Sequence, residues 1–321
     1  MPLFLVRALT LLTIVFLSAV ANSSFAKEHS KRAILVTGAS SGIGHQIALT
    51  LSQNGYFVYA GARKERDILA LSKLPNIQGI RLDVTKDEDI DSALKRIKSA
   101  GRGLYGLVNN AGVFVYDPLI EISEEDMAFV NDVNVMGPYR VSKAFAPLII
   151  ESEGRISTIG SISGLFAGQL FGPYSMSKHA MEAYSEALAK EMEKFDVQVS
   201  VVEPGNFRSN IMKNMEKRLK SIDQGDRKTQ YRDEIARLVS FVNTDRSHHA
   251  SPEPVANAVL EFMSSEKPKF RYLVTPNKQE ADYAIKRSLQ KVVELNQDHE
   301  FSLSNEALLE MLRSLLGKAE K

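Results

Sequence analysis

The chain has 321 residues, of which 44% are hydrophobic, 40 are lysine or arginine, 39 are aspartate or glutamate, and none is cysteine. The apolar fraction excludes a wholly disordered chain, and the formal net charge of +1 excludes a strongly basic nucleic-acid-binding protein. The absence of cysteine excludes disulfides, thiolate catalysis, zinc–thiolate sites and cysteine-ligated iron–sulfur clusters.

Residues 1–26 differ in composition from the rest of the chain. Their one charged residue is Arg7, and an uncharged, mostly apolar run follows it. A charged start, a short apolar region and the small residues at 24–26 are typical of a signal peptide, so we predict export through the secretory pathway. The alternative is an uncleaved anchor across a bilayer of about 30 Å, with membrane association through residues 3–26. Because basic residues follow the segment, such an anchor would leave the main domain facing the cytoplasm.

Residues 31–276 alternate short β-branched runs with longer amphipathic stretches, and we interpret them as one domain. Continuous apolar strands separated by helices predict an α/β fold, a Rossmann-like doubly wound parallel sheet with helices on both faces. The predicted strands are residues 33–37, 56–60, 77–81, 104–109, 155–159, 197–202 and 270–274, and the predicted helices are 43–53, 87–100, 131–152, 174–195 and 252–264.

Two segments extend this domain beyond the minimal fold. Residues 206–250 form a long, highly charged insertion whose apolar residues recur at helical spacing, which predicts two amphipathic helices. Connections of this length are usually lids or binding loops, so we predict a substrate lid here. Residues 277–321 form a C-terminal helical extension, with predicted helices over 279–295 and 305–316.

The first predicted strand leads directly into a glycine-rich turn, residues 37–44, which reads Thr-Gly-Ala-Ser-Ser-Gly-Ile-Gly and opens a helix. Glycines let the backbone turn sharply and approach a pyrophosphate, and the N-terminus of a helix supplies N–H donors. The context predicts a dinucleotide site, whose binding residues are Gly38, Ser40, Ser41, Gly42, Ile43 and Gly44.

A tyrosine and a lysine further along the chain have the spacing of a proton-transfer pair. Tyr174 and Lys178 share one face of a predicted helix because they are one turn apart. A tyrosine with a pKa of about 10 is a poor base at neutral pH, and a nearby ammonium lowers that pKa. Ser161, at the end of the fifth predicted strand, is placed to hydrogen-bond the same substrate oxygen. Asn134, inside a predicted helix, would extend a proton path through Lys178 and water.

The order and spacing of these motifs resemble the short-chain dehydrogenase/reductase family over residues 37–205. The resemblance implies that Asn134, Ser161, Tyr174 and Lys178 are catalytic. It implies further cofactor contacts at the ends of successive strands. These are Asp83 and Val84 near the adenine, Asn110 in the Asn-Asn-Ala-Gly run of residues 109–112, Tyr174 and Lys178 themselves, and Pro204 and Gly205 at the nicotinamide.

The end of the second predicted strand indicates which nucleotide is bound. An acid there holds the ribose 2′-OH of NAD, whereas an arginine accommodates the 2′-phosphate of NADP. This chain has Ala62 where NAD-preferring relatives carry aspartate, and Arg63 follows it. We therefore predict NADP. NAD stays an alternative, because Ser41 replaces the basic residue that many NADP-using relatives carry.

The resemblance implies an NADP-dependent oxidoreductase that interconverts a carbonyl and an alcohol on a small molecule. The turn over residues 203–208 is similar to that of relatives acting on steroids and retinoids, so we expect an apolar, steroid-, retinoid- or lipid-like substrate. One alternative is a 3-oxoacyl-thioester reductase. Another is a non-catalytic dinucleotide-binding sensor, which would have no need of Tyr174 as a base.

Other partners are weighed on local pattern. We expect no nucleic-acid site, since Glu216 interrupts the basic run of residues 213–220. We expect no metal, since His248 and His249 have no spaced third ligand beside them. The sequence leaves the oligomeric state open, a homo-oligomer included.

Overall fold

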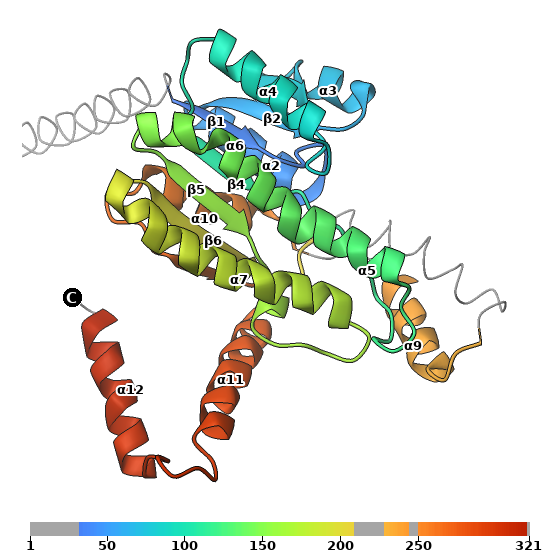
Figure 1. Cartoon of the computed structure of the whole chain (residues 1–321), viewed down its shortest axis with the longest axis vertical. Helices are drawn as coiled ribbons and strands as arrows, with labels where there is room; N and C mark the ends of the chain where they lie inside the picture. Colours follow the sequence, from blue (N-terminus) through green and yellow to red (C-terminus); the bar gives the residue numbers. More distant parts are fainter. Residues whose placement is uncertain (1–31, 209–227, 244–249, 320–321) are drawn as a thin grey trace, which may run out of the picture. The chain divides into compact units, whose positions relative to one another are not determined.

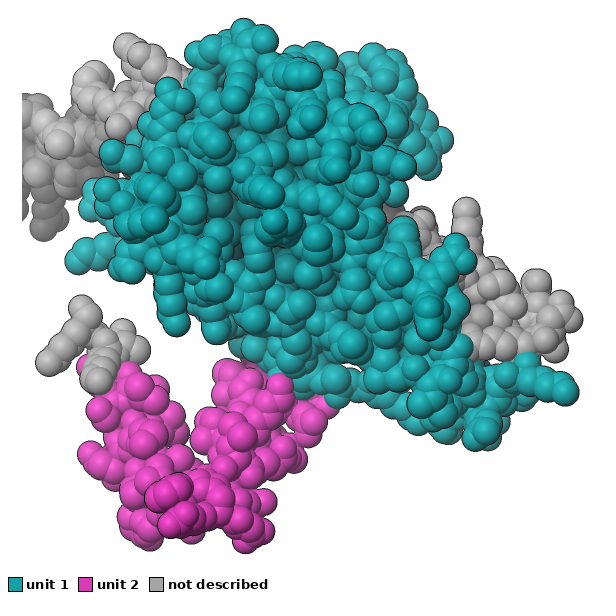
Figure 2. Space-filling model, in the orientation of Figure 1, with its two compact units in different colours: residues 1–276 teal, residues 277–321 magenta. Residues whose placement is uncertain are grey.

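The computed structural model describes residues 32–208, 228–243 and 250–319, and the chain divides into two compact units, residues 1–276 and 277–321 (Figure 2). The predicted signal peptide or anchor at residues 1–26 lies outside the described residues, as do residues 209–227 and 244–249 of the predicted lid. Among the helices that are described, none combines the length and the hydropathy needed to cross a membrane.

The first unit is built on one parallel sheet of seven strands in the order β3-β2-β1-β4-β5-β6-β7 (Figure 1). Every neighbouring pair in the sheet is parallel. This confirms the Rossmann-like α/β fold expected from the alternation of strands and helices. The strands are β1 Ala33–Val36, β2 Phe57–Ala62, β3 Ile77–Arg81, β4 Gly106–Asn109, β5 Arg155–Ile159, β6 Gln198–Pro204 and β7 Arg271–Val274.

Helices cover both faces of the sheet (Figure 1). On one face α2 (Gly42–Gln53) packs against α10 (Glu253–Ser264), and on the other lie α4 (Asp87–Ser99), α6 (Gly137–Glu151) and α7 (Gly172–Met192). Strand β1 is buried throughout, and its residues alternate between the two cores: Ile34 and Val36 belong to one, Ala33 and Leu35 to the other. A strand covered on both faces has no polar side, which explains its continuous apolar sequence.

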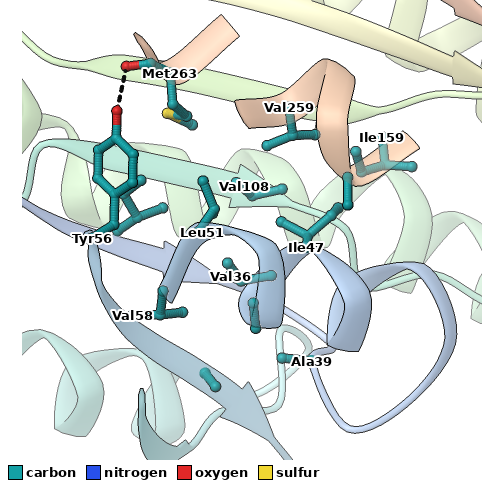
Figure 3. Close-up of a cluster of buried hydrophobic side chains, with 14 of the residues drawn as sticks. Val36, Ala39, Ile47, Leu51, Tyr56, Val58, Val108, Ile159, Val259 and Met263 are labelled. Atoms are coloured by element: carbon teal, nitrogen blue, oxygen red, sulfur yellow. Dashed lines mark hydrogen bonds between the residues drawn. The ribbon is translucent and has the colours of Figure 1, made fainter. Parts of the chain in front are cut away.

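Figure 3 shows the core between β1 and helices α2 and α10. Ile47 and Leu51 of α2 meet Val36 and Val108 of the sheet, and all are fully buried. The buried Tyr56 completes this core by donating a hydrogen bond from its hydroxyl to the carbonyl of Met263, at 2.9 Å. A buried phenol needs such a partner, because an unpaired hydroxyl in an apolar core costs about 1–3 kcal/mol.

The helix predicted over residues 131–152 is more complex in the structure. Helix α5 (Glu124–Asn131) begins at Ser123, whose side chain accepts a hydrogen bond from the N–H of Asp126. A π-helical turn, Asp132–Met136, then joins it to α6. Pro138 has no N–H to give to the carbonyl four residues earlier, so the helix can widen here at little cost. Neither α5 nor the short α3 (Glu65–Leu71) was predicted, since the predicted helix begins only at residue 131.

One described helix belongs to the predicted insertion. Helix α9 (Arg232–Asn243) buries Ile235 and Leu238 against Tyr116 and Leu170. The described part of the insertion therefore packs its apolar side on the first unit, close to the loop that follows β4.

The second unit contains two helices, α11 (Lys278–Leu295) and α12 (Asn305–Ala319). Helix α11 starts where the Asn277 side chain accepts from the N–H of Glu280, at 2.9 Å. The link between the helices is closed by Asn296, whose amide group pairs with both the N–H and the carbonyl of Leu303.

Candidate active site

The glycine-rich turn lies against the loop that follows β4, the neighbour of β1 in the sheet. Gly38 has a φ of +65°, and a Cβ there would lie 2.8 Å from the Cα of Ala111. A Cβ on Gly44 would lie 2.2 Å from the amide nitrogen of Asn110. Glycine is therefore required at both positions. Gly38 needs it for its backbone conformation and for space, and Gly44 needs it for space.

Hydrogen bonds fasten these two loops together. The Thr37 hydroxyl accepts from the N–H groups of Asn110 and Ala111, both at 3.0 Å, and donates to the carbonyl of Val108. The Asn110 amide donates to the carbonyls of Thr37 at 2.9 Å and Gly38 at 3.1 Å. Asn110 thus shapes the predicted cofactor loop. Thr37 was missed as a site residue, although a hydroxyl directly after a strand and before a glycine is a visible signal.

The start of α2 offers backbone donors toward the space in front of this turn. Ser41 precedes the helix, no side chain caps its N-terminus, and its first turn contains no acid. Uncapped N–H groups at the positive end of a helix dipole suit an anion. Together with the glycine turn, they fit the pyrophosphate of a dinucleotide.

The predicted 2′-phosphate position lies at the end of β2. Ala62 is buried and leaves the turn without a carboxylate, while the Arg63 side chain is exposed. The guanidinium of Arg81, at the end of the neighbouring β3, donates to the Arg63 carbonyl at 3.1 Å and pairs with Asp89 at 3.1 Å. The second arginine at this edge was not anticipated, because only the pairing of β2 with β3 brings the two together.

The predicted adenine contacts follow β3. The Asp83 carboxylate accepts from both the N–H and the hydroxyl of Thr85, at 3.1 and 2.8 Å. Val84 is buried, and its side chain lies so close to Gly137 that a Cβ there would approach it to 2.7 Å. Strand β3 therefore ends in a rigid turn at the same edge of the sheet as the glycine turn.

Asn134 lies in the π-helical turn between α5 and α6 and is 2% exposed. Its amide accepts from the N–H of Val113 at 2.8 Å and donates to the Val113 carbonyl at 2.9 Å. It also donates to the Ser177 hydroxyl on α7 at 3.0 Å. Asn134 therefore ties the loop after β4 to α7, the helix that carries Tyr174. The structure shows no direct contact between Asn134 and Lys178.

Ser161, Tyr174 and Lys178 come together where β5 ends and α7 begins. Tyr174 and Ser161 are joined by a side-chain hydrogen bond, and both are buried. The Lys178 ammonium donates to the carbonyl of Ile159, the last residue of β5, at 2.7 Å. It lies 5.6 Å from the centre of the Tyr174 ring. The grouping predicted from spacing is thus present.

The pKa of Tyr174 differs from the one expected from the sequence. Burial raises the pKa of Tyr174 to about 12, and the hydrogen bond from Ser161 only partly offsets the rise. Burial also lowers the pKa of Lys178 to about 8, against the charge of Glu182, which raises it. From the sequence, we expect the nearby ammonium to lower the pKa of the tyrosine. In the structure desolvation is the larger effect, because it disfavours the phenolate directly.

An aromatic group that the sequence analysis missed lies beside the Tyr174 ring. The Phe114 ring stacks on the Tyr174 ring with 3.7 Å between centroids, and Tyr116 and Phe171 pack against Phe114. Residues of α9 close the same apolar cluster. The only signal in the sequence is the aromatic pair at positions 114 and 116, directly after the Asn-Asn-Ala-Gly run.

The predicted nicotinamide turn follows β6. Pro204 is the last residue of that strand, and the N–H of Gly205 donates to the carbonyl of Val274 on β7 at 2.8 Å. This turn, the ends of β4 and β5, and the glycine turn all lie at the carboxyl edge of one parallel sheet. Ligands of open α/β sheets bind at that edge.

A family model described as short chain dehydrogenase matches residues 32–220. The chain is 34% identical to the bovine mitochondrial D-beta-hydroxybutyrate dehydrogenase over 267 residues, 75% of this chain and 76% of the relative. It is 35% identical to a 3beta-hydroxysteroid dehydrogenase of Caenorhabditis elegans over 210 residues, 61% of this chain and 54% of the relative. It is 36% identical to mouse retinol dehydrogenase 7 over 182 residues, 56% and 57% of the two chains.

Solved structures agree with the fold. A short-chain dehydrogenase from Streptomyces avermitilis superposes with a TM-score of 0.70 at 27% identity, over 83% of this chain and 95% of the other. A metagenomic short-chain oxidoreductase in complex with NADP gives a TM-score of 0.60 at 23% identity, over 77% and 98%. A Burkholderia phymatum enzyme in complex with NAD gives 0.70 at 23% identity, over 85% and 98%.

Proposed function

Because this chain belongs to the short chain dehydrogenase family of NAD(P)-dependent oxidoreductases, which interconvert a C=O group and a CH–OH group, we propose that its active site is the group of side chains around Tyr174. The observation that supports this most is the meeting of the Tyr174 phenol, the Ser161 hydroxyl and the Lys178 ammonium at the carboxyl edge of the sheet, beside the glycine turn. The proposed catalytic residues are Asn134, Ser161, Tyr174 and Lys178.

A bound nicotinamide nucleotide would supply or accept the hydride. The protein's own part is the proton on the substrate oxygen. Ser161 hydrogen-bonds and orients that oxygen, and Tyr174 donates its phenolic proton to it during reduction. The positive charge of Lys178 stabilises the phenolate that is left. Asn134 holds Val113 and Ser177, which keeps the β4 loop and α7 in register, and it would extend the proton path through Lys178 and water.

The raised pKa of Tyr174 indicates which proton-transfer role it can take at neutral pH. With a pKa of about 12 the phenol keeps its proton at neutral pH, so it is ready to act as an acid and is rarely available as a base. Carbonyl reduction needs the acid, whereas alcohol oxidation needs the phenolate. At neutral pH Tyr174 is therefore in the form that carbonyl reduction uses, while the ratio of reduced to oxidised nucleotide sets the net direction.

We propose NADP as the nucleotide, with NAD as the alternative. The residues that would hold it are the glycine turn for the pyrophosphate, Arg63 for the 2′-phosphate, Asp83 and Val84 at the adenine, Pro204 and Gly205 at the nicotinamide, and in addition Asn110, Tyr174 and Lys178. What supports NADP is the end of β2, where Ala62 offers no carboxylate and the exposed Arg63 offers a guanidinium. An arginine–phosphate contact is charge-assisted and often bidentate.

Replacing Arg63 with alanine is expected to weaken NADP binding by about ten- to a hundredfold and to leave NAD binding nearly unchanged. A hydrogen bond to a charged group contributes about 1.5–3 kcal/mol, and each 1.4 kcal/mol is one decade in Kd. Ala62→Asp goes further, since the added carboxylate repels the phosphate and accepts from the ribose of NAD. The measurement is kcat/KM for both nucleotides at fixed ionic strength.

Arg66→Ala is the matched control, because Arg66 is an arginine on the neighbouring α3 with a side chain 77% exposed. It should change neither nucleotide's kcat/KM by more than about twofold, in line with the small contribution of exposed ion pairs. A wild-type preference for NAD, or an unchanged preference in Arg63→Ala, means that the phosphate is held elsewhere.

For the substrate we propose an apolar carbonyl compound of steroid-, retinoid- or lipid-like character. The aromatic group beside Tyr174 and the apolar side of α9 support this, because polar small substrates gain little from such surroundings. The relatives act, by their names, on hydroxybutyrate, hydroxysteroids and retinol. The substrates in these names therefore include both a short acid and large apolar molecules.

The test is NADPH oxidation by the purified full-length chain with a ketosteroid, retinal and an acetoacetyl thioester. We expect turnover of the ketosteroid or retinal. Turnover of the thioester alone would favour the 3-oxoacyl-thioester reductase. Tight nucleotide binding without oxidation in the presence of any carbonyl would favour the non-catalytic sensor.

The domain organisation and location remain proposals. We propose that residues 31–276 form the oxidoreductase domain, with 206–250 as its substrate lid, and that 277–321 are an extension. For residues 1–26 we retain the signal peptide, with the membrane anchor as the alternative. A homo-oligomer is compatible with these proposals.

A further inference from the structure

Three charged side chains from different elements meet next to the proposed active site, and we call them the acid–arginine cluster: Glu182 on α7, Glu203 on β6 and Arg271 on β7. One guanidinium nitrogen of Arg271 donates to both Glu182 and Glu203. The other donates to Glu186, an outer residue of α7, at 3.0 Å. The side chains of Glu203 and Glu182 are only 1% and 12% exposed.

With both carboxyl groups ionised, the cluster would contain more negative than positive charge. Two largely buried carboxylates share one guanidinium, and burying charge in this way is costly unless it is fully paired. One oxygen of each carboxylate, Oε1 of Glu182 and Oε2 of Glu203, accepts no hydrogen bond from any residue within the described ranges. Burial and the charge of Glu182 raise the pKa of Glu203 above its ordinary value. Folding stability alone does not explain why these incompletely paired carboxylates are buried here.

The position of the acid–arginine cluster indicates a functional reason. Glu182 lies one helical turn after Lys178, and its Oε1 lies against the backbone on both sides of Ser161. A Cβ on Gly160 or on Gly164 would come within 3.0 Å of that oxygen. Glu203 directly precedes the Pro204–Gly205 turn. The acid–arginine cluster therefore touches the segments that carry Ser161, Lys178 and the proposed nicotinamide turn.

The charge of Glu182 also acts on Lys178. Burial lowers the pKa of Lys178 to about 8, and Glu182 opposes that effect. Without Glu182 this opposing charge would be lost, and the lysine would lose its proton nearer neutral pH. A neutral lysine cannot stabilise a phenolate on Tyr174.

We propose that Glu182, held in place by Arg271 and Glu203, is a positioning residue that keeps Lys178 charged beside Tyr174 during turnover. The inference rests on the proposed function, in which Tyr174 transfers the proton and the Lys178 ammonium supports it.

Other groups near Lys178 do not replace Glu182 in this role. On α7, the neighbouring His179 turns its Nδ1 to the carbonyl of Ser175. In the π-helical turn, Asp132 pairs with Arg140 instead. The acids of α5 lie in its first turn. From the sheet, β5 presents the carbonyl of Ile159 to the ammonium, while the charged members of β6 and β7 are Glu203 and Arg271 themselves.

The test is the pH profile of kcat/KM for carbonyl reduction in the full-length chain. We expect the wild-type value to fall above a pH of about 8, where Lys178 loses its proton. Glu182→Gln keeps the shape of the side chain and removes its charge. Its alkaline limb should therefore move to lower pH by about one unit, while kcat at pH 6 stays within about threefold of wild type.

Glu186→Gln is the matched control. Glu186 lies on the same helix and bonds the same arginine, but its side chain is 55% exposed and it lies a further turn from Lys178. Its alkaline limb should stay at the wild-type position. Glu182→Asp retains the charge. The alkaline limb of its pH profile should therefore lie within about 0.3 pH units of the wild-type position, even if its melting temperature changes.

The outcomes distinguish a failure of the proposed function from a failure of the role assigned to Glu182. An active wild type that loses activity in Tyr174→Phe supports the proposed function. The role assigned to Glu182 is wrong if, in that active enzyme, Glu182→Gln lowers the melting temperature and leaves the pH profile unchanged. It is also wrong if Glu182→Gln changes kcat/KM by the same factor at every pH. If Glu182→Gln does not fold, Glu182→Asp decides, since a limb shifted in Asp despite its charge overturns the inference. A wild type inactive with every carbonyl overturns both levels.

Discussion

Tyr174→Phe is expected to lower kcat/KM for carbonyl reduction by about 10²–10⁴-fold, the usual contribution of a positioned acid or base. The variant keeps the ring that stacks on Phe114 at 3.7 Å, so the apolar surroundings of the site persist. It loses the hydrogen bond to Ser161, which costs about 1 kcal/mol of folding stability. Activity should therefore fall by far more than stability.

The measurement is kcat/KM together with the Kd of NADPH and the melting temperature. Tyr184→Phe is the control. It lies on the same helix, and its hydroxyl contacts the Pro138 carbonyl at 3.5 Å and hydrogen-bonds the Ser142 side chain, neither of which belongs to the proposed site. We expect it to retain kcat/KM within about twofold and Tyr174→Phe to retain the nucleotide Kd. A Tyr174→Phe enzyme within a few-fold of wild type would remove Tyr174 from the role of proton donor.

Gly44→Ala is expected to weaken nucleotide binding by about a hundredfold. The new methyl group would lie 2.2 Å from the Asn110 amide nitrogen and 2.6 Å from the Gly38 carbonyl oxygen. To make room, Asn110 must leave its bonds to the carbonyls of Thr37 and Gly38, which shape the glycine turn. Overpacking against backbone costs up to about 3 kcal/mol, and that is about two decades in Kd. Alanine's better helix propensity returns at most about 1 kcal/mol, so the clash dominates.

The experiment is a titration with NADPH followed by its fluorescence, paired with thermal unfolding. Gly168→Ala is the control, since its Cβ would meet nothing closer than 3.8 Å and glycine is not required there by a positive φ. It should bind NADPH as the wild type does. If Gly44→Ala also bound NADPH with wild-type affinity, the glycine turn would not be what holds the nucleotide.

Features that depend on local sequence were predicted well. Strands β3 and β5 have the predicted bounds, and the other strands differ by a few residues at their ends. Buried parallel strands are continuous apolar runs, so their composition alone separates them from the amphipathic helices between them. The glycine turn and the one-turn spacing of Tyr174 and Lys178 are equally local, and that is why the proposed site was identified without a structure. Helix α3 was missed because its short, charged sequence buries only Ile68 and Leu71.

Properties that depend on neighbours distant in sequence were decided by the tertiary structure. The direction of the Tyr174 pKa shift follows from its burial, to which Phe114 of the distant β4 loop contributes by stacking on the ring. The acid–arginine cluster joins Glu182 to Arg271 across 89 residues, which no local pattern indicates. The sequence by itself determined the fold class and the choice of the side chains proposed to react, because hydrophobic periodicity and turn chemistry act over a few residues. Desolvation and charge at the site depend on which elements pack around those side chains, so only the folded chain sets them.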